Sequence, residues 1–390
     1  MQGYVRADGR KGIRNRALVI YLGEGMRQMA RDIVRPLRAA GVDLIGFGGT
    51  RPDRHVVTIL QRLATHPNVG AVLVLDEGSD TMGDWLVNAV EASARPALLV
   101  NTCGGRRAAL TSAHAWIAQA VEQLRKTPKV SLTCADLVIG TICGGSDSTS
   151  ALSANPAIGL AYDRLLAADA TAIFEETGEL IGCDRLLAER AVTSHVAQAI
   201  LSAMEKATRF FAQLGHGSFA PGNAEGGLTT IEEKSLGAYS KSGSMPIAGV
   251  LRPGETPIAK GLYLMDKIPD GPVRYGYSDA TDNVGITEMI ACGAHLVLFS
   301  TGRGSVVGSA IAPVIKICAN PDTYRILSDD MDIDAGRVLE GMATLAELGE
   351  EIVELVLRVA GGEQPCSELL GHQEFLLTHK WFAERMSAES

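Results

Sequence analysis

The sequence lacks the features expected of a membrane protein or of a nucleic-acid-binding protein. Its 390 residues contain no apolar run long enough to span a bilayer, and the first four, Met1 to Tyr4, carry no apolar signal segment. The net charge of −9 disfavours nucleic acid or an anionic membrane surface as the main partner. We therefore expect a cytoplasmic protein that acts on a small molecule and binds neither membrane nor nucleic acid.

Compact signatures for cofactors and metals are also missing. The chain has no His-x-x-x-His pair and no Cys-x-x-Cys pair, and no Gly-x-Gly-x-x-Gly motif opens a helix after the first predicted strand. Its seven cysteines are odd in number and scattered, which fits a reducing compartment better than a disulfide framework. A nicotinamide cofactor is therefore not expected, and any metal would be held by residues from distant segments.

What the sequence does contain is an alternation of short apolar runs with helical patterns. The apolar runs are Ala17–Leu22, Asp43–Phe47, Ala71–Leu75 and Ala97–Val100. This alternation predicts βαβ units and a doubly wound parallel sheet. We expect an α/β protein with a Rossmann/flavodoxin-like domain over residues 1–127, which begins with an arginine-rich arm, and a larger α/β catalytic domain over residues 128–390.

The arginine-rich arm offers cations to an acidic ligand. Arg6, Arg10 and Arg14 lie within twelve residues of the start of the arm, and Asn15 follows them. Arginine binds carboxylate or phosphate with two parallel hydrogen bonds, so the arm is a candidate clamp for an acidic substrate. A solvated arm with no binding role is the alternative.

A glycine-rich loop before a predicted helix is the second candidate anion site. Gly226 and Gly227 permit close backbone approach, and the helix that starts near Thr230 adds free N–H donors and a partial positive charge. The simpler alternative is a capping box made by Thr230 and Glu233. Candidate ligand-binding or catalytic residues here are Glu225, Gly226, Gly227, Thr229, Thr230 and Lys234.

Three further loops follow predicted strands. The first runs from Cys143 to Ser150, where Cys143 is a candidate nucleophile, a metal ligand or only a small buried residue. The second contains Glu175 and Glu176, adjacent carboxylates that suit a general base, metal ligands or a solvated acidic turn. In the third, Arg303 lies among glycines in a loop that we interpret as an anion nest.

Oxygen ligands from these loops favour particular metals. The candidate oxygen ligands are Asp147, Glu175, Glu176 and Asp282, to which Cys143 could be added. Such a set suits Fe(II), Mn or Mg better than zinc.

Several motifs taken together resemble the altronate/galactarate dehydratase family. They are Gly3–Asn15, Cys143–Asp147 with Ala154–Pro156, Gly222–Gly237, Thr301–Gly304 and Val314–Asn320, and they cover nearly the whole chain in order. One branch of the family that this chain also resembles is the sulfolactate sulfo-lyase large subunit.

The resemblance implies a lyase that removes water from a hydroxylated sugar acid through an enediolate to give a 2-keto acid. The alternative is release of sulfite from a sulfolactate-like acid. It also implies a divalent metal, usually iron, and a small N-terminal domain that we do not expect within this chain. A separate small subunit and a homo-oligomer are therefore expected.

The sequence departs from the family pattern at residues 45–51. Sugar-acid dehydratases of the family usually carry a His and a Gly-Cys pair there, and this chain has neither. The departure motivates a second hypothesis, a ligand-binding subunit without catalytic activity.

The resemblance leads to an assignment of roles. The expected catalytic residues are Glu176 or Lys234 as the base, with Cys143 and Glu225. The metal would be held by Cys143 with Asp147 or Glu175. Substrate-binding residues would be Arg6, Arg10, Arg14, Asn15, Ser146, Asn155, Gly226, Gly227, Thr229, Thr230 and Arg303.

Overall fold

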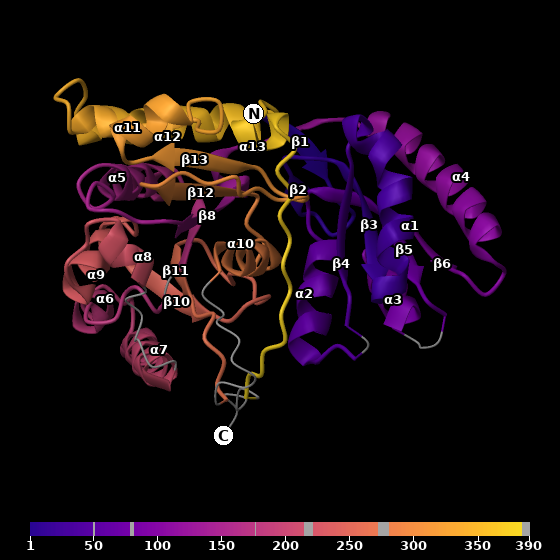
Figure 1. Ribbon diagram of the computed structural model, residues 1–390, viewed down its shortest axis with the longest axis horizontal. Helices are drawn as coiled ribbons and strands as arrows, with labels where there is room; N and C mark the ends of the chain where they lie inside the picture. The colour runs from indigo at the N-terminus through magenta and orange to yellow at the C-terminus, as the bar shows by residue number, and fades with distance from the viewer. Residues whose placement is uncertain (50, 79–81, 176, 214–220, 272–280, 384–390) are drawn as a thin grey trace.

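The computed structural model describes residues 1–49, 51–78, 82–175, 177–213, 221–271 and 281–383. The described chain contains two parallel sheets and a small antiparallel sheet. Figure 1 shows the strands and helices of the N-terminal part on one side and the larger C-terminal part on the other. The predicted α/β class is confirmed, with a parallel sheet in each part. The predicted domain limits, 1–127 and 128–390, stay a prediction.

The N-terminal parallel sheet has helices on both faces. Its order is β4-β3-β5-β6, with strands β3 (Arg16–Leu22), β4 (Val42–Phe47), β5 (Val69–Asp76) and β6 (Ala97–Asn101). Residues of α1 (Glu24–Val34) and α4 (Arg106–Arg125) share a core with one face. Residues of α2 (Arg54–Ala64) and α3 (Met82–Ala92) lie in the core on the other face. This is the doubly wound arrangement that the apolar runs predicted.

The C-terminal parallel sheet has the order β10-β11-β9-β8-β12-β13-β14. Leu296 and Leu298 of β12 pack in one core, and Val297 and Phe299 pack in another, since successive side chains of a strand point to opposite faces. The strands are β8 (Val138–Cys143), β9 (Thr171–Glu175), β10 (Ile247–Leu251), β11 (Leu262–Met265), β12 (Leu296–Thr301), β13 (Val314–Cys318) and β14 (Ile333–Asp334).

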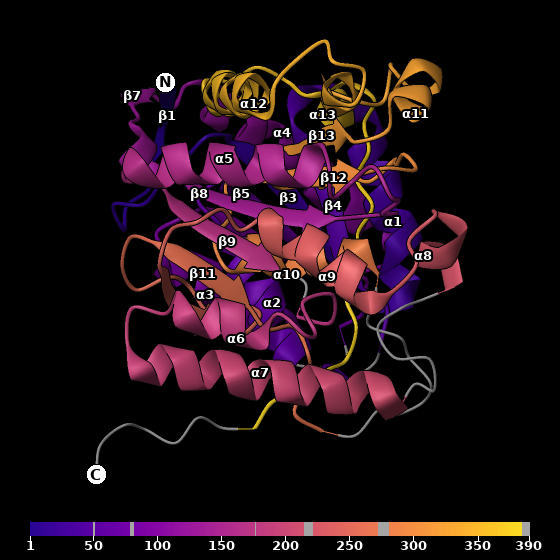
Figure 2. The same ribbon diagram turned by 90° about the vertical axis from the view of Figure 1, so that its left-hand side faces the viewer.

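Helices cover both faces of this sheet and surround its carboxyl edge (Figure 2). Helices α5 and α12 contribute to the core on one face, and α10 contributes to the core on the other. The helices are α5 (Ala154–Ala167), α6 (Asp184–Glu189), α7 (Ser194–Gln213), α8 (Pro221–Glu225), α9 (Ile231–Ser240), α10 (Asp282–Ala291), α11 (Pro321–Ile326), α12 (Leu345–Ala360) and α13 (Cys366–Leu369).

The strand order reverses between β8 and β12. From β8 the chain continues to β9 on one side, and it later returns to place β12 on the other side. In an open parallel sheet such a reversal separates the loops at the carboxyl ends of the two strands and opens a crevice for a ligand. The loops that follow Cys143 and Thr301 therefore lie where a ligand site is expected.

The arginine-rich arm is folded, and its turn at residues 7–10 is exposed. It forms a hairpin of β1 (Gln2–Val5) and β2 (Lys11–Gly12), and β1 also pairs with β7 (Val130–Ser131). The hairpin thus ties the start of the chain to the segment that enters the C-terminal part.

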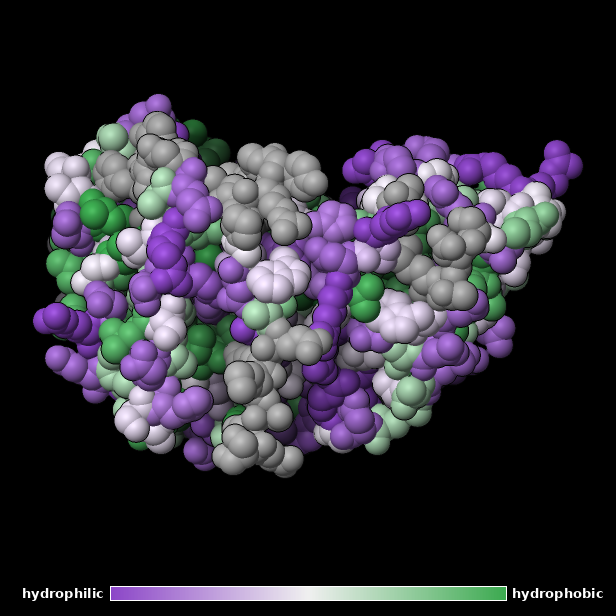
Figure 3. Space-filling model, turned by 90° about the horizontal axis from the view of Figure 1, so that it is seen from below, coloured by the Kyte–Doolittle hydropathy of each residue, from purple (hydrophilic) through white to green (hydrophobic). Residues whose placement is uncertain are grey.

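The two parts share buried contacts. One hydrophobic cluster includes Ile45 and Val56 of the N-terminal part with Met289 of the C-terminal part. Figure 1 shows the final segment, in yellow, running between the parts, and Figure 3 shows hydrophilic side chains where the two lobes meet. Lys380 of this segment, which is fully buried, lies 2.7 Å from Glu288 of α10.

Candidate active site

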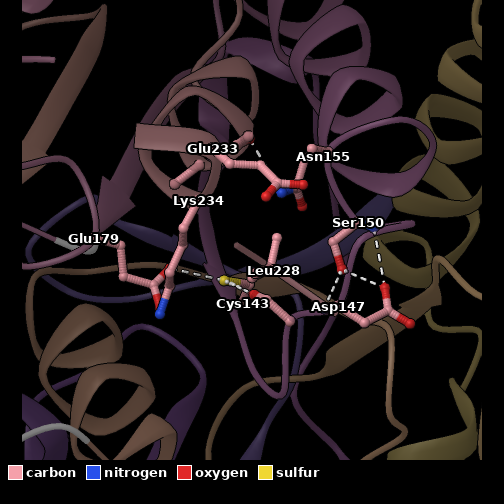
Figure 4. Close-up of a pocket in the computed structure, with 12 residues that line it drawn as sticks. Cys143, Asp147, Ser150, Asn155, Glu179, Leu228, Glu233 and Lys234 are labelled. Atoms are coloured by element: carbon pink, nitrogen blue, oxygen red, sulfur yellow. Dashed lines mark hydrogen bonds and ion pairs between the residues drawn. The ribbon is translucent and has the colours of Figure 1, made fainter. Parts of the chain in front are cut away.

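A pocket opens at the carboxyl edge of the C-terminal sheet, beside the reversal point. Its empty space, including the open mouth, is about 230 Å³. Figure 4 shows Cys143, Glu179 and Lys234 on one side of it and Asp147 with Ser150 on the other. The lining residues are Cys143, Ser146, Asp147, Ser150, Ala151, Asn155, Glu179, Leu228, Glu233, Lys234, Gly237 and Ala238.

Three functional groups form a continuous line in this pocket. The Nζ atom of Lys234 lies 2.6 Å from Oε1 of Glu179, and the Cys143 thiol donates to Oε2 of the same carboxylate over 3.0 Å. Cys143 and Lys234 are buried, with 5% and 8% of their surfaces exposed. An ammonium, a carboxylate and a thiol in direct contact can bind an anion, accept a proton and donate a proton.

Each member of this line comes from a different segment. Cys143 ends strand β8, Glu179 lies in the turn after β9, and Lys234 lies in the first turns of α9. Lys234 Nζ also donates to Oδ1 of Asn223 over 3.1 Å, which connects α9 to α8. The pocket therefore depends on the positions of β8, β9 and α9 together.

The glycine loop packs directly on the loop that follows β8. The Ser148 N–H donates to the Gly226 carbonyl over 3.0 Å. A Cβ atom at Gly226 would lie 2.6 Å from the Ser146 carbonyl oxygen, so a larger residue does not fit. Gly227 has a φ of 86°, which glycine adopts readily. These two glycines therefore serve the close contact between the loops.

One half of the capping box expected as the simpler alternative is present. Thr230 is the N-cap of α9, and its hydroxyl accepts from the Glu233 N–H over 3.2 Å. The Glu233 carboxylate in turn accepts from the N–H and the hydroxyl of Thr229, which lowers the pKa of Glu233. Thr229 and Thr230 thus hold the start of the helix that carries Lys234.

Asp147 is held by hydrogen bonds on both carboxylate oxygens. Oδ1 accepts from the N–H groups of Thr149 and Ser150 and from their hydroxyls, and Oδ2 accepts from Asn320 over 3.0 Å. A Cβ atom at Gly302 would lie 2.2 Å from Oδ1 of Asp147. The carboxylate is therefore used to join the loops after β8, β12 and β13.

Asn155 and Ser146 also have partners at the pocket wall. The Asn155 amide donates to the Gly237 carbonyl over 3.1 Å and accepts from the Ser300 hydroxyl over 2.8 Å. The Ser146 hydroxyl lies 3.2 Å from the Cys143 sulfur and donates to the Gly144 carbonyl. The Ser146 hydroxyl thus contacts the thiol of the line of three groups.

Glu175 lies behind the pocket in a buried ion pair. Its Oε1 lies 3.0 Å from Nζ of Lys267, and 1% of the Glu175 surface is exposed. Burial raises the pKa of the Glu175 carboxyl, and Lys267 offsets this only in part. Lys267 was not predicted, because nothing in its sequence context distinguishes it from a surface lysine.

Arg303 and Glu225 lie outside the pocket wall. Arg303 Nη2 lies 3.7 Å from Oε2 of Glu225, and the side chains are 47% and 69% exposed. The N–H of Arg303 donates to the Gly145 carbonyl, so its backbone is fixed beside the Cys143 loop. This exposed pair spans the loops after α8 and β12.

The arginines of the arm are not brought to the pocket. Arg6 donates to the Pro67 carbonyl and to Asn15, and Arg14 forms a buried ion pair of 2.7 Å with Glu368. Arg10 binds Asp8 in the hairpin turn. The structure thus uses Arg6, Arg14 and Asn15 to connect segments, and their expected role as a substrate clamp has no support from this geometry.

The predicted metal ligands are not gathered around a common point. Glu175 is paired with Lys267, and both oxygens of the Asp147 carboxylate already accept hydrogen bonds. Within the described residues, no group of three or more His, Cys, Asp or Glu side chains is placed to hold a metal. These residues do not fit the expected metal, and we derive no step through it. The metal stays a prediction. Glu176, one of the two residues predicted as the base, lies outside the described residues.

Glu179 is the functional residue that the sequence reasoning missed. It lies four residues after Glu175 in the acidic turn that follows β9, and it alone contacts both Cys143 and Lys234 among the described residues of that turn. The carboxylate-rich turn was the one signal in the sequence that could have indicated Glu179. Spacing within a turn does not show which of its carboxylates enters the pocket, so Glu179 was not singled out.

Comparisons with known proteins identify the family. Residues 134–383 match the model of the D-galactarate/altronate dehydratase C-terminal domain, and residues 3–125 match the second domain of D-galactarate dehydratase/altronate hydrolase. The chain belongs to this family of dehydratases and related lyases.

Three curated relatives show the range of the family. The chain is 33% identical to the (2R)-sulfolactate sulfo-lyase subunit beta of Chromohalobacter salexigens, over 96% of each chain. It is 28% identical to the altronate dehydratase of Escherichia coli, over 94% of this chain and 75% of the relative. It is 34% identical to the galactarate dehydratase (L-threo-forming) of Escherichia coli, over 63% of this chain and 45% of the relative.

In the part of the chain that the structure describes, no helix is both long and apolar enough to cross a bilayer.

Proposed function

We propose that this protein is a hydro-lyase that eliminates water from a hydroxylated sugar acid and yields a 2-keto acid. The contact of Glu179 with both Lys234 and Cys143 in the pocket carries this proposal. Family membership supports it, because the relatives include altronate and galactarate dehydratases.

The reaction requires a base for the proton on the carbon next to the substrate carboxylate. Removing this proton creates an enediolate whose negative charge lies on the carboxylate oxygens, and an adjacent cation stabilises it. The Glu179 carboxylate accepts the proton, and the Lys234 ammonium binds the enediolate oxygens. Lys234 thereby acts as the electrophile rather than as the base that the family resemblance led us to expect.

The leaving hydroxyl requires a proton, and the thiol of Cys143 supplies it. The bond from the β-carbon to oxygen breaks with its electron pair, and the oxygen takes the thiol proton to leave as water. Glu179, which holds the proton from the α-carbon, returns it to the thiolate along the 3.0 Å hydrogen bond. The enol product then takes a proton from solvent at the β-carbon and becomes the 2-keto acid.

A second function is favoured by one observation. The (2R)-sulfolactate sulfo-lyase subunit beta matches this chain over 96% of both lengths. With a sulfolactate-like acid, the same proton removal would break the carbon–sulfur bond and release sulfite. The enol that remains would become pyruvate. Sulfite leaves as a stable anion, so this elimination does not need the Cys143 proton.

We also propose a separate small subunit and self-association. The relative's name, subunit beta, denotes one polypeptide of a larger enzyme. Size-exclusion chromatography with light scattering on natively purified protein tests both points. A single polypeptide of monomer mass would contradict them.

A substrate panel tests the proposed function. Purified protein is incubated with Fe(II) without oxygen, and with altronate, galactarate and (2R)-sulfolactate in separate reactions. We expect a 2-keto acid without sulfite from at least one sugar acid. Sulfite formed only from sulfolactate would favour the second function. No product from any acid, with binding still seen as a rise in Tm, would favour a ligand-binding subunit without catalysis.

A further inference from the structure

A group of arginines lies at the hairpin of the arginine-rich arm, apart from the pocket. Arg95, between α3 and β6, is 5% exposed and lies 3.7 Å from the Asp8 carboxylate. Asp8 is itself bound by Arg10, whose Nε and Nη2 lie 2.9 and 2.7 Å away. Two guanidinium groups, those of Arg10 and Arg95, therefore pair with one carboxylate, and the guanidinium of Arg6 is close enough to interact with it electrostatically.

The hydrogen bonds of Arg95 differ from those of its neighbours. Arg6 donates to the Pro67 and Arg14 carbonyls and to Asn15, and Arg10 donates to Asp8 and to the Thr65 carbonyl. By contrast, Nε, Nη1 and Nη2 of Arg95 are buried and donate no hydrogen bond to any described residue. A buried cation without hydrogen bonds is costly, so its retention needs a reason other than stability.

The charges at this position do not balance. The charged groups that act on Arg95 are Arg10 and Arg6, which repel it, and Asp8, which attracts it. Burial, followed by these two arginines, lowers the pKa of Arg95 to about 10. Burial lowers the pKa of the adjacent His66 well below its usual value, so His66 adds no charge near neutral pH. Three cations and one anion leave two positive charges.

This group lies at the opposite edge of the sheets from the pocket. Arg95 precedes β6, and His66 precedes β5, so both are at the amino ends of parallel strands. The ring of His66 lies edge-on to that of His295, which accepts from the N–H of Val138 at the start of β8. The six residues of β8 then separate this edge from Cys143 by about 17 Å. A ligand here does not share the pocket.

We propose that Arg95 and Arg10 form a binding site for a small tetrahedral oxyanion such as phosphate. The planar guanidinium of arginine matches two oxygens of such an anion, and the two unbalanced positive charges match a dianion. Asp8 occupies part of the position that the anion would take, since its Oδ2 lies 3.7 Å from Nη2 of Arg95. The anion enters beside the exposed turn at Asp8 and Gly9 and replaces the long contact between Asp8 and Arg95.

Binding of inorganic phosphate to the full-length protein tests this proposal. Tm is measured against phosphate concentration at pH 7.5 with ionic strength held constant by sodium chloride, and calorimetry gives the stoichiometry. We expect a saturable rise in Tm with one phosphate per chain, because a ligand that binds only the folded state stabilises it. Sulfate should act like phosphate, and acetate should act more weakly.

Four variants separate the site from a structural role. Arg95→Met should abolish the rise, whereas Arg107→Met, at an exposed arginine of α4, should keep it. Asp8→Asn removes the competing carboxylate and should strengthen phosphate binding several-fold. Lys234→Met, in the pocket, should leave phosphate binding unchanged, which keeps this test independent of the proposed lyase activity.

Either of two results would overturn the proposal. One is the absence of a saturable rise in Tm with phosphate in the unmodified protein, and the other is an equal rise in Arg95→Met. If Arg95→Met does not fold, weaker phosphate binding in Asp8→Asn than in the unmodified protein would also overturn the proposal.

Discussion

Lys234 and Glu179 form an ion pair of 2.6 Å that joins helix α9 to the turn after β9. The pair brings a cation and a carboxylate to one pocket wall, and the Cys143 thiol contacts the same carboxylate. Lys234 lies in the first turn of α9, Glu179 lies in a turn, and Cys143 is the last residue of β8, so three different kinds of element at the carboxyl edge of the sheet supply the chemistry. The strands fix where the loops at this edge begin.

The first prediction concerns Glu179. Glu179→Gln keeps the shape of the side chain but removes the proton acceptor, so kcat should fall by roughly 10²- to 10⁴-fold. KM should change less, since Lys234 remains to bind the substrate carboxylate. Steady-state kinetics on the substrate found in the panel measures both. Glu232→Gln, at an exposed carboxylate of α9, is the matched control. A normal kcat in Glu179→Gln would exclude Glu179 as the base.

The second prediction separates the two leaving groups. Cys143→Ala should slow water elimination by about 10²-fold, because the leaving hydroxyl loses its proton donor. Sulfite release should be affected much less, because sulfite needs no proton to leave. Parallel assays of 2-keto acid and sulfite measure this difference. Equal loss of both activities would show that Cys143 has a structural role instead.

The third prediction concerns a buried ion pair of the C-terminal part, beside its junction with the N-terminal part. Lys380→Met leaves the buried Glu288 carboxylate with His55, 3.1 Å away, as a remaining partner, so the loss should be about 3 kcal/mol, at the low end of the cost of breaking a buried pair. The free energy of unfolding from urea titration measures the loss, with Lys129→Met, at an exposed lysine, as the control. The double variant Lys380→Met with Glu288→Gln should recover part of it. A loss under 1 kcal/mol would mean that water reaches Glu288.

The fourth prediction is a pH dependence of stability from His295. Its Nδ1 accepts from the Val138 N–H, and Nε2 contacts the Lys11 carbonyl, so the neutral ring satisfies both. Burial lowers the pKa of His295 to about 4, from 6.5 in the unfolded chain. Between these values the unfolded chain binds more protons, so stability falls as the pH falls.

The size of this effect follows from the pKa difference. The unfolding free energy should decrease by about 3 kcal/mol from His295 as the pH falls from 6.5 to 4. Urea titrations across this range measure the slope. His295→Gln should have a smaller slope, and His114→Gln, at an exposed histidine, should keep it. An unchanged slope in His295→Gln would contradict the assignment.

The sequence predicted the fold well because its apolar runs are short and regularly spaced. The strands predicted at Ala17–Leu22 and Ala97–Val100 each match an observed strand to within one residue. The loops after Cys143 and Thr301 also lie together, since the carboxyl ends of parallel strands share one edge.

The roles of individual polar residues were harder to predict, because they depend on distant partners. Arg14 pairs with Glu368, which is 354 residues away in the chain, and the Asp147 carboxylate accepts a hydrogen bond from Asn320. No local pattern shows such contacts. Glu179 was missed for a related reason, since the direction of a side chain in a turn is set by the helices that pack around it.

The central claim is that Glu179 removes the α-proton of a hydroxy acid. Proton NMR in D₂O, with the unmodified protein and Glu179→Gln compared on the same acid, tests it most directly. We predict a 2-keto acid with one deuteron at the β-carbon from the unmodified protein, and formation at least about 10²-fold slower with Glu179→Gln. Equal rates of deuterated product from both proteins would contradict the claim.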